Sequence, residues 1–142
     1  MSDVGAVAFR DLLKRKKLKF TRERKRLLEE AVNEKAHFDA DAWYLRLRQK
    51  GVEVSRDTVF RSIPLLLEAG VLQKSVGRGK GEYFENAGQT GHHDHMVCLQ
   101  CGRVIEFASE KIERLQEQIA QSRGFHLKFH DHRLYGYCDK CR

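Results

Sequence analysis

Apolar residues in the first half of the chain recur at intervals of three and four, which is the spacing of a buried helix face. One such segment covers about residues 7–18. Three more helices are expected after Thr21, Asp39 and Ser55, because these side chains accept hydrogen bonds from helix N-termini. A glycine follows each of the last two segments and supplies the stop.

The third and fourth of these helices are separated only by the short turn 51–54. This arrangement is typical of a helix-turn-helix, whose second helix reads DNA. Pro64 falls inside that second helix, where it removes one backbone hydrogen bond. We expect the helix to bend there or the bonding to be relieved locally. The base-reading turn, 56–61, precedes the proline.

Two short segments of strand-forming residues follow, 71–76 and 82–85, around a glycine-rich turn. They predict a β-hairpin, which behind a helix-turn-helix is a wing. The turn lacks the Gly-Lys-Ser/Thr ending and the following helix of a phosphate-binding loop. Arg78 and Lys80 at its tip are candidates for DNA contact, although turn geometry and solubility explain the same residues equally well.

Residues 86–91 are rich in glycine and polar side chains, so we expect a hinge there. It separates a winged-helix DNA-binding domain at 1–85 from a metal-binding dimerisation domain at 92–142. The expected fold class is α+β, with an N-terminal winged helix-turn-helix domain plus a small β-α-β-β dimerisation domain with structural zinc.

The small domain begins with expected strands at 95–98 and 103–107, on either side of a Cys-x-x-Cys-Gly knuckle. A helix with one apolar face follows, and further strands are expected at about 126–130 and 132–138. About 50 residues are too few to form a stable core unaided. Zinc and dimerisation are therefore expected to contribute to its stability.

Charge distinguishes the two halves of the chain. The 142 residues include 27 Lys+Arg and 20 Asp+Glu, a net charge of +7. Residues 1–86 carry 19 basic against 13 acidic side chains, whereas residues 87–142 carry 8 against 7. A basic half favours a polyanionic partner, most simply nucleic acid, with a solvated helix face as the plain alternative.

The N-terminal residues lack the basic and apolar regions of a secretory signal. No apolar run reaches the roughly 18 residues of a membrane span. We therefore expect a cytoplasmic protein without membrane contact. Thiols stay reduced inside cells, which favours metal binding over disulfides.

All four cysteines fall in two Cys-x-x-Cys pairs, one beginning at Cys98 and the other at Cys138. Four thiolates complete the tetrahedral shell of Zn²⁺ and leave no open position, so such a site is structural. Its binding free energy becomes folding free energy, because it joins the start of the small domain to its end. Disulfides or unligated thiols are the alternative.

Four metal-binding side chains adjoin the first of these pairs, at 92–95. Successive side chains of a strand face opposite ways, so His92 and Asp94 face one side and His93 and His95 the other. One tetrapeptide can thus serve two metal sites. Mixed imidazole and carboxylate ligands suit Fe(II), Mn(II), Co(II) or Zn(II). Candidates for the remaining ligands are His37, Glu85, Glu106, Glu113, His126, His130 and His132.

Together these features resemble the ferric uptake regulator family of bacterial metal-dependent repressors, over about residues 8–141. The most specific matches are the histidine and cysteine cluster at 92–102, the run Val-Ile-Glu-Phe at 104–107, and Asp-Thr-Val-Phe-Arg at 57–61.

By position, the resemblance implies three metal sites. The structural zinc site comprises Cys98, Cys101, Cys138 and Cys141. The regulatory site at the hinge comprises His37, Glu85, His93, His95 and Glu106. A third site, within the dimerisation domain, comprises His92, Asp94, Glu113 and His130. Whether His130 or His132 serves in the third site is open.

The resemblance also implies DNA contacts. Arg61 stands where the family presents an arginine to DNA, and Phe60 stands where a tyrosine is more usual. Phe60 keeps apolar contact with a thymine methyl but loses a hydroxyl, and its alternative role is a core side chain. The other expected contacts are Thr58, Arg56, Arg24 and Lys19.

We therefore expect a homodimeric transcriptional repressor of metal-uptake genes, which binds a palindromic operator in double-stranded DNA and is not an enzyme. The expected metals are structural Zn²⁺ and regulatory Fe²⁺ or Mn²⁺, with Fe(II) favoured. A glutamate at position 85 argues against zinc sensing, and a glutamate at position 106 argues against peroxide sensing. Assembly beyond the dimer, to a tetramer, is open.

Two alternatives belong to other classes of protein. A metallohydrolase built on His93 and His95 needs an open coordination position and a general base, and no such motif is present. A DNA-architectural protein with only structural zinc binds DNA whether or not metal is added.

Overall fold

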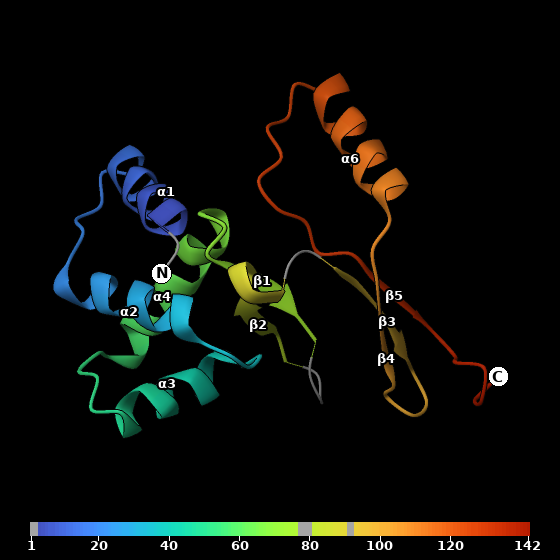
Figure 1. The fold of residues 1–142 in the computed structure, drawn as a ribbon, viewed down its shortest axis with the longest axis horizontal. Helices are drawn as coiled ribbons and strands as arrows, with labels where there is room; N and C mark the ends of the chain where they lie inside the picture. Colours follow the sequence, from blue (N-terminus) through green and yellow to red (C-terminus); the bar gives the residue numbers. More distant parts are fainter. Residues whose placement is uncertain (1–2, 77–80, 91–92) are drawn as a thin grey trace. The chain divides into compact units, whose positions relative to one another are not determined.

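The computed structural model describes residues 3–76, 81–90 and 93–142 (Figure 1). The chain forms two compact units, Met1–Gly91 and His92–Arg142. The first contains helices and a two-stranded sheet, and the second contains a three-stranded sheet and a helix. The α+β class is confirmed.

The first four helices of the chain lie in the first unit, and three of them start at the expected caps. Thr21 accepts a hydrogen bond from the N–H of Arg24, Asp39 from Ala42 and Ser55 from Thr58. These bonds satisfy N–H groups that a helix start leaves without partners. The helices are α1 (Asp3–Arg15), α2 (Arg22–Asn33), α3 (Ala40–Gln49) and α4 (Arg56–Glu68).

The first helix lies a few residues earlier than 7–18. Ala6 packs against the core, so helical structure before residue 7 is stabilised by burial. At the other end Lys17 has a φ of 57° and the N–H of Leu18 donates to the carbonyl of Leu13, so the helix stops at Arg15.

One hydrophobic core holds this unit together. Its centre is Trp43, which is fully buried and stacks on Phe38 with ring centroids 4.9 Å apart. Each large side chain buried in this way stabilises the fold by about 1.5–3 kcal/mol. The other fully buried side chains include Phe9, Leu13, Leu27, Leu47, Val59 and Leu66.

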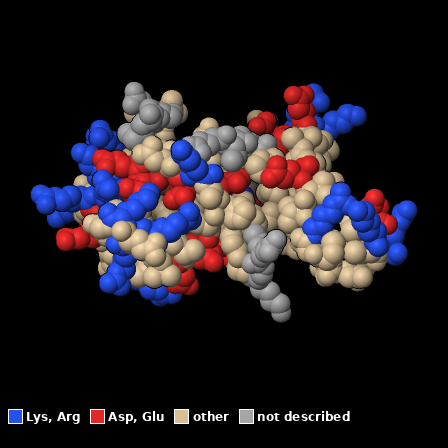
Figure 2. All heavy atoms as spheres, turned by 60° about the horizontal axis from the view of Figure 1, so that its bottom comes forward, with Lys and Arg blue, Asp and Glu red and all other residues tan. Residues whose placement is uncertain are grey.

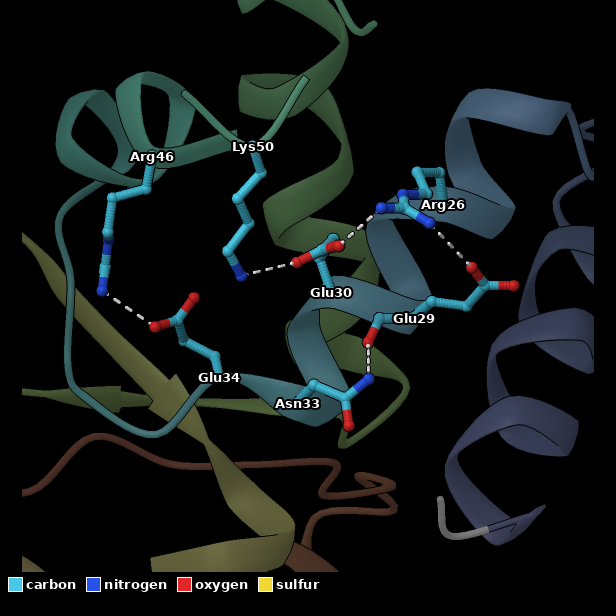
Figure 3. Close-up of polar contacts among 7 residues, drawn as sticks. All are labelled: Arg26, Glu29, Glu30, Asn33, Glu34, Arg46 and Lys50. Carbon is cyan, nitrogen blue, oxygen red and sulfur yellow. Dashed lines mark hydrogen bonds and ion pairs between the residues drawn. The ribbon is translucent and has the colours of Figure 1, made fainter. Parts of the chain in front are cut away.

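Ion pairs on the surface attach α3 to α2 (Figure 3). Glu30 on α2 contacts Arg26 at 3.0 Å and Lys50 at 3.0 Å, and Glu34 contacts Arg46 at 2.8 Å. The two glutamate side chains are only 12% and 10% exposed, so these pairs are screened less than ordinary surface pairs. These ion pairs hold α3, the first helix of the helix-turn-helix, against α2.

Pro64 does not end α4, which continues from Arg56 to Glu68. The segment after the proline carries buried Leu66 and Leu67, and the N–H of Ala69 donates to the carbonyl of Leu65. Packing of this face keeps the helix in place where the proline removes one backbone bond.

The expected wing is present as β1 (Leu72–Ser75) and β2 (Tyr83–Asn86), which pair antiparallel. Its tip, with Arg78 and Lys80, lies outside the described residues. Asn86, expected in the hinge, is the buried last residue of β2 and donates to the carbonyl of Val32. A short helix, α5 (Ala87–Thr90), follows directly.

The second unit has the order β3 (Asp94–Cys98), β4 (Val104–Phe107), α6 (Glu110–Ser122) and β5 (Arg133–Gly136). In its sheet β3 is central, antiparallel to β4 and parallel to β5. The strand expected at 126–130 is wrong: that segment is irregular, and β5 is the one described strand that follows α6. The unit is therefore β-β-α-β and not β-α-β-β.

This second unit buries little apolar surface. Among its described residues Cys98 is the one buried apolar side chain. The apolar residues left exposed include Leu115, Ile119, Phe125, Tyr135 and Tyr137. Metal and a partner chain are therefore needed to stabilise it, as the small size of the unit already indicated.

Candidate metal centres and DNA-reading face

The four cysteines converge at one end of the second unit. The Sγ atoms of Cys98, Cys101, Cys138 and Cys141 all lie within 4.8 Å of one another. The Sγ atoms of Cys101 and Cys138 are 3.8 Å apart, and all four residues are thiols. The donor set fits tetrahedral Zn²⁺.

The sheet brings these cysteines together. Cys98 ends β3, and parallel pairing places it opposite Gly136, two residues before Cys138. Gly102 has a φ of 77°, which lets the chain turn tightly after the first thiol pair. The two knuckles thus meet although 36 residues separate them.

The thiol surroundings differ within this set. Backbone N–H groups of Cys101 and then Cys138 donate to the Sγ of Cys98 and lower its pKa to about 6. Hydrogen bonding to Cys138 and burial raise the pKa of Cys141 to about 12. A bound Zn²⁺ would deprotonate all of its thiol ligands, because its charge dominates the site.

A second group comprises His93, His95 and Glu106, whose ligand atoms lie within 4.8 Å of one another. His95 is buried and pairs directly with Glu106 across β3 and β4. The Nε2 of His93 lies 3.6 Å from Oε1 of Glu106, and the two imidazole centroids are 4.8 Å apart. Two imidazoles and a carboxylate suit Fe(II), Mn(II) or Zn(II).

The first unit places the two other expected ligands of this site side by side. An antiparallel bridge between Phe38 and Phe84 puts His37 opposite Glu85. Glu85 is buried and accepts hydrogen bonds from Gln73 at 2.8 Å and Ser75 at 3.2 Å. His37 is exposed, with its ring edge-on to Tyr83.

A third group comprises Asp94, Glu113 and His130. The Nε2 of His130 lies 3.4 Å from Oδ1 of Asp94 and 3.2 Å from Oε1 of Glu113. His132 is outside this group, and its ring meets Phe107 edge-on at 6.1 Å. The irregular chain before β5 thus delivers His130, and not His132, to the carboxylates. His92 lies outside the described residues.

The recognition helix α4 exposes the side chains expected to read DNA. Phe60 is 37% exposed, so it is not a core residue. Arg61 pairs with Asp57 at 3.1 Å, and the hydroxyl of Thr58 contacts that of Ser55 at 2.8 Å. Lys and Arg side chains gather over the first unit (Figure 2).

The expected backbone contacts Arg24 and Lys19 lie next to each other. The guanidinium of Arg24 donates to the carbonyl of Lys19 at 2.6 Å and so fixes the loop before α2. Arg24 is half-buried and Lys19 is exposed.

Three polar partners were not expected from the sequence. Gln73 and Ser75 hold Glu85 across the wing, and Asp41 on α3 contacts Arg56 on α4. No sequence signal marks these contacts, because each joins separate elements. The pair of Asp57 with Arg61 was readable, since residues four apart meet on a helix.

Known proteins resemble this chain along nearly its whole length. The Ferric uptake regulator family matches residues 15–137. A ferric uptake regulation protein from Campylobacter jejuni is 36% identical over 141 residues, covering 98% of this chain and 89% of the relative. One from Yersinia pestis is 39% identical over 133 residues, covering 92% and 89%.

Solved structures agree. The Helicobacter pylori ferric uptake regulator, described with three functional metal binding sites, has a TM-score of 0.61, 26% identity and coverage of 98% and 92%. The Pseudomonas aeruginosa ferric uptake regulator with manganese has a TM-score of 0.60, 33% identity and coverage of 89% and 95%.

A winged helix-turn-helix in a chain with three candidate metal-binding groups is the arrangement of a metal-dependent DNA-binding regulator. The chain belongs to the ferric uptake regulator family. It is a transcriptional repressor that binds operator DNA as a homodimer, and it is not an enzyme. No helix within residues 3–76, 81–90 and 93–142 is long and apolar enough to cross a membrane.

Proposed function

We propose that Fe(II) is the regulatory metal and that it binds His93, His95 and Glu106 together with His37 and Glu85. The observation that carries this proposal is the mixed imidazole and carboxylate group formed by His93, directly before β3, His95 on β3 and Glu106 on β4. Such ligands favour borderline divalent ions over soft Cu(I). His37 and Glu85 lie opposite each other in the first unit, so one ion would bind ligands of both units.

Metal acts in this proposal by fixing the dimer in a DNA-binding arrangement. A winged-helix dimer binds a palindrome only when its recognition helices match the half-site spacing. Without metal only a fraction of the dimers can bind the operator, and the apparent affinity is the intrinsic affinity multiplied by that fraction. Because linkage is reciprocal, operator DNA tightens metal binding by the same factor.

The other metal groups have separate roles. We propose that Cys98, Cys101, Cys138 and Cys141 hold structural Zn²⁺, and that Asp94, Glu113 and His130, with His92, hold a third ion. DNA contacts come from Arg61, Phe60, Thr58, Arg56, Arg24, Lys19, Arg78 and Lys80. The regulated genes encode proteins of metal uptake. The protein works in the cytoplasm.

The test is anaerobic fluorescence anisotropy with a palindromic duplex selected from random sequence by the metal-loaded protein. Fe(II), Mn(II) and Zn(II) are titrated into protein that retains only its thiolate-bound zinc. We expect affinity to rise at least about tenfold with Fe(II), the effect of a coupling of about 1.4 kcal/mol. The ranking of the midpoints identifies the metal.

The matched variants are His93→Ala and His126→Ala. His126 is an exposed histidine of the second unit outside the three groups, so its variant keeps the metal response. His93→Ala is expected to lose the response while keeping its thiolate-bound zinc. A flat, high affinity with every metal, or a normal response from His93→Ala, contradicts the proposal.

A further inference from the structure

An acidic side chain contacts one of the proposed DNA-contacting arginines. Oδ1 of Asp41, in the first turn of α3, accepts hydrogen bonds from Nε of Arg56 at 3.1 Å and from Nη2 at 2.9 Å. Both side chains are exposed, so this contact lies on the surface of the helix-turn-helix.

The same arginine covers an aromatic ring. The guanidinium carbon of Arg56 lies 4.3 Å from the ring centroid of Phe60, one turn further along α4. Asp41, Arg56 and Phe60 thus form a stack that spans both helices. One face of the ring proposed to contact a thymine methyl is occupied by the guanidinium.

The strength of these contacts makes them exchangeable. An exposed ion pair contributes little, because water and salt screen it. Bidentate contact to a guanine edge, or contact with several phosphates, is strong enough to displace it. A single phosphate on unrelated DNA must still compete with Asp41 for the same guanidinium and approach a negative charge.

We propose that Asp41 restrains DNA binding by holding Arg56 against Phe60, so that DNA must break this contact before Arg56 can bind it. The inference rests on the proposed reading of DNA by α4. On unrelated DNA, Arg56 remains bound to Asp41 and adds no phosphate contact. On the operator, base and phosphate contacts release Arg56 and uncover the ring of Phe60.

The test compares Asp41→Asn with the parent on two duplexes, the selected palindrome and a shuffled duplex of equal length and composition. Anisotropy is measured at saturating metal and at several salt concentrations. We expect Asp41→Asn to bind the palindrome about twofold to fivefold more tightly, which is the contribution of the exposed ion pair that the parent must break. The shuffled duplex should gain no more than the palindrome, with a salt slope steeper by about one, as for one added phosphate contact.

Two controls separate this role from general charge and from helix stability. Glu117→Gln removes one exposed carboxylate from α6 in the other unit and is expected to leave both affinities unchanged. Asp41→Asn is also made in an Arg56→Gln background, where its effect should vanish if Asp41 acts through Arg56. Fluorescence of Trp43, the one tryptophan of the chain, checks folding.

A larger gain on the shuffled duplex than on the palindrome, an effect no larger than that of Glu117→Gln, or an undiminished effect in the Arg56→Gln background overturns the inference. Failure of the proposed function has a different signature. In that case the parent protein itself shows no metal response, while its preference for the palindrome still tests Asp41. A parent without that preference overturns the inference as well.

Discussion

The pKa of the Cys98 thiol is lowered and that of the Cys141 thiol is raised, because the surroundings of the two side chains differ. Two backbone N–H groups stabilise the thiolate of Cys98, whereas neighbouring thiols and burial disfavour the thiolate of Cys141. Ionising all four neighbouring thiols would place four negative charges close together, which is unfavourable unless a cation binds there. The geometry therefore suits a metal ion, which would supply the positive charge that four thiolates need.

Replacing Cys98 tests this conclusion. We expect Cys98→Ser to lose the zinc, because a serine hydroxyl does not replace a thiolate ligand. Structural zinc contributes about 10–16 kcal/mol, which equals or exceeds the whole stability of a typical domain, about 5–15 kcal/mol. The second unit should then unfold and the dimer dissociate, as measured by metal analysis and light scattering. Retention of a zinc-free, folded dimer would falsify a structural role for the site.

The elements of the first unit could be predicted because their signals are local. Thr21, Asp39 and Ser55 each accept from an N–H three residues on, and glycines follow α3 and α4. The strand expected at 126–130 was wrong because a strand depends on pairing with a distant segment, which no local signal shows. The described sheet of the second unit consists of β4, β3 and β5, and residues 126–130 pair with none of these strands.

The ligands of the metal groups also differ in whether local sequence could predict them. Adjacent side chains at 93–95 could be assigned to opposite faces from the alternation of a strand alone. The choice of His130 over His132 could not, because it depends on the path of an irregular segment. Likewise, no local pattern shows that Ser75 hydrogen-bonds Glu85 across the wing.

Pro64 gives a prediction at the scale of one element. Replacing it with alanine restores a backbone donor in the middle of α4, and proline in a helix interior costs roughly 3 kcal/mol relative to alanine. The unfolded chain gains freedom, which offsets about 0.4–1 kcal/mol. We expect Pro64→Ala to stabilise the protein by about 1–2 kcal/mol, less than the full difference because packing already holds the helix. Chemical denaturation at saturating metal measures it.

An unchanged or lowered stability in that variant would mean that α4 is shaped around the proline. DNA affinity then distinguishes two cases. If affinity also falls, the local shape of the helix at Pro64 is part of the DNA-binding surface. If affinity is unchanged, the proline serves the packing of α4 alone.

At the scale of the whole molecule, stability is distributed unevenly between the two units. The first has a continuous core around Trp43, and the second has exposed apolar residues on both its helix and its sheet. On α6, Leu115 and Ile119 are four residues apart, so they share one face, and their exposures are 57% and 59%. A homodimer can bury this face twice, once in each copy.

Ile119→Glu is therefore expected to weaken the dimer. Burying one isoleucine side chain is worth about 1.5–3 kcal/mol, and symmetry doubles the loss. This corresponds to a dissociation constant raised roughly a hundredfold or more, at about 1.4 kcal/mol per factor of ten. Sedimentation across a range of protein concentrations measures the shift. Gln121→Glu adds the same charge at an exposed polar position of α6 and should leave the dimer intact. If both variants dimerise like the parent, the apolar face of α6 lies outside the dimer interface, and the exposed sheet residues must form that interface instead.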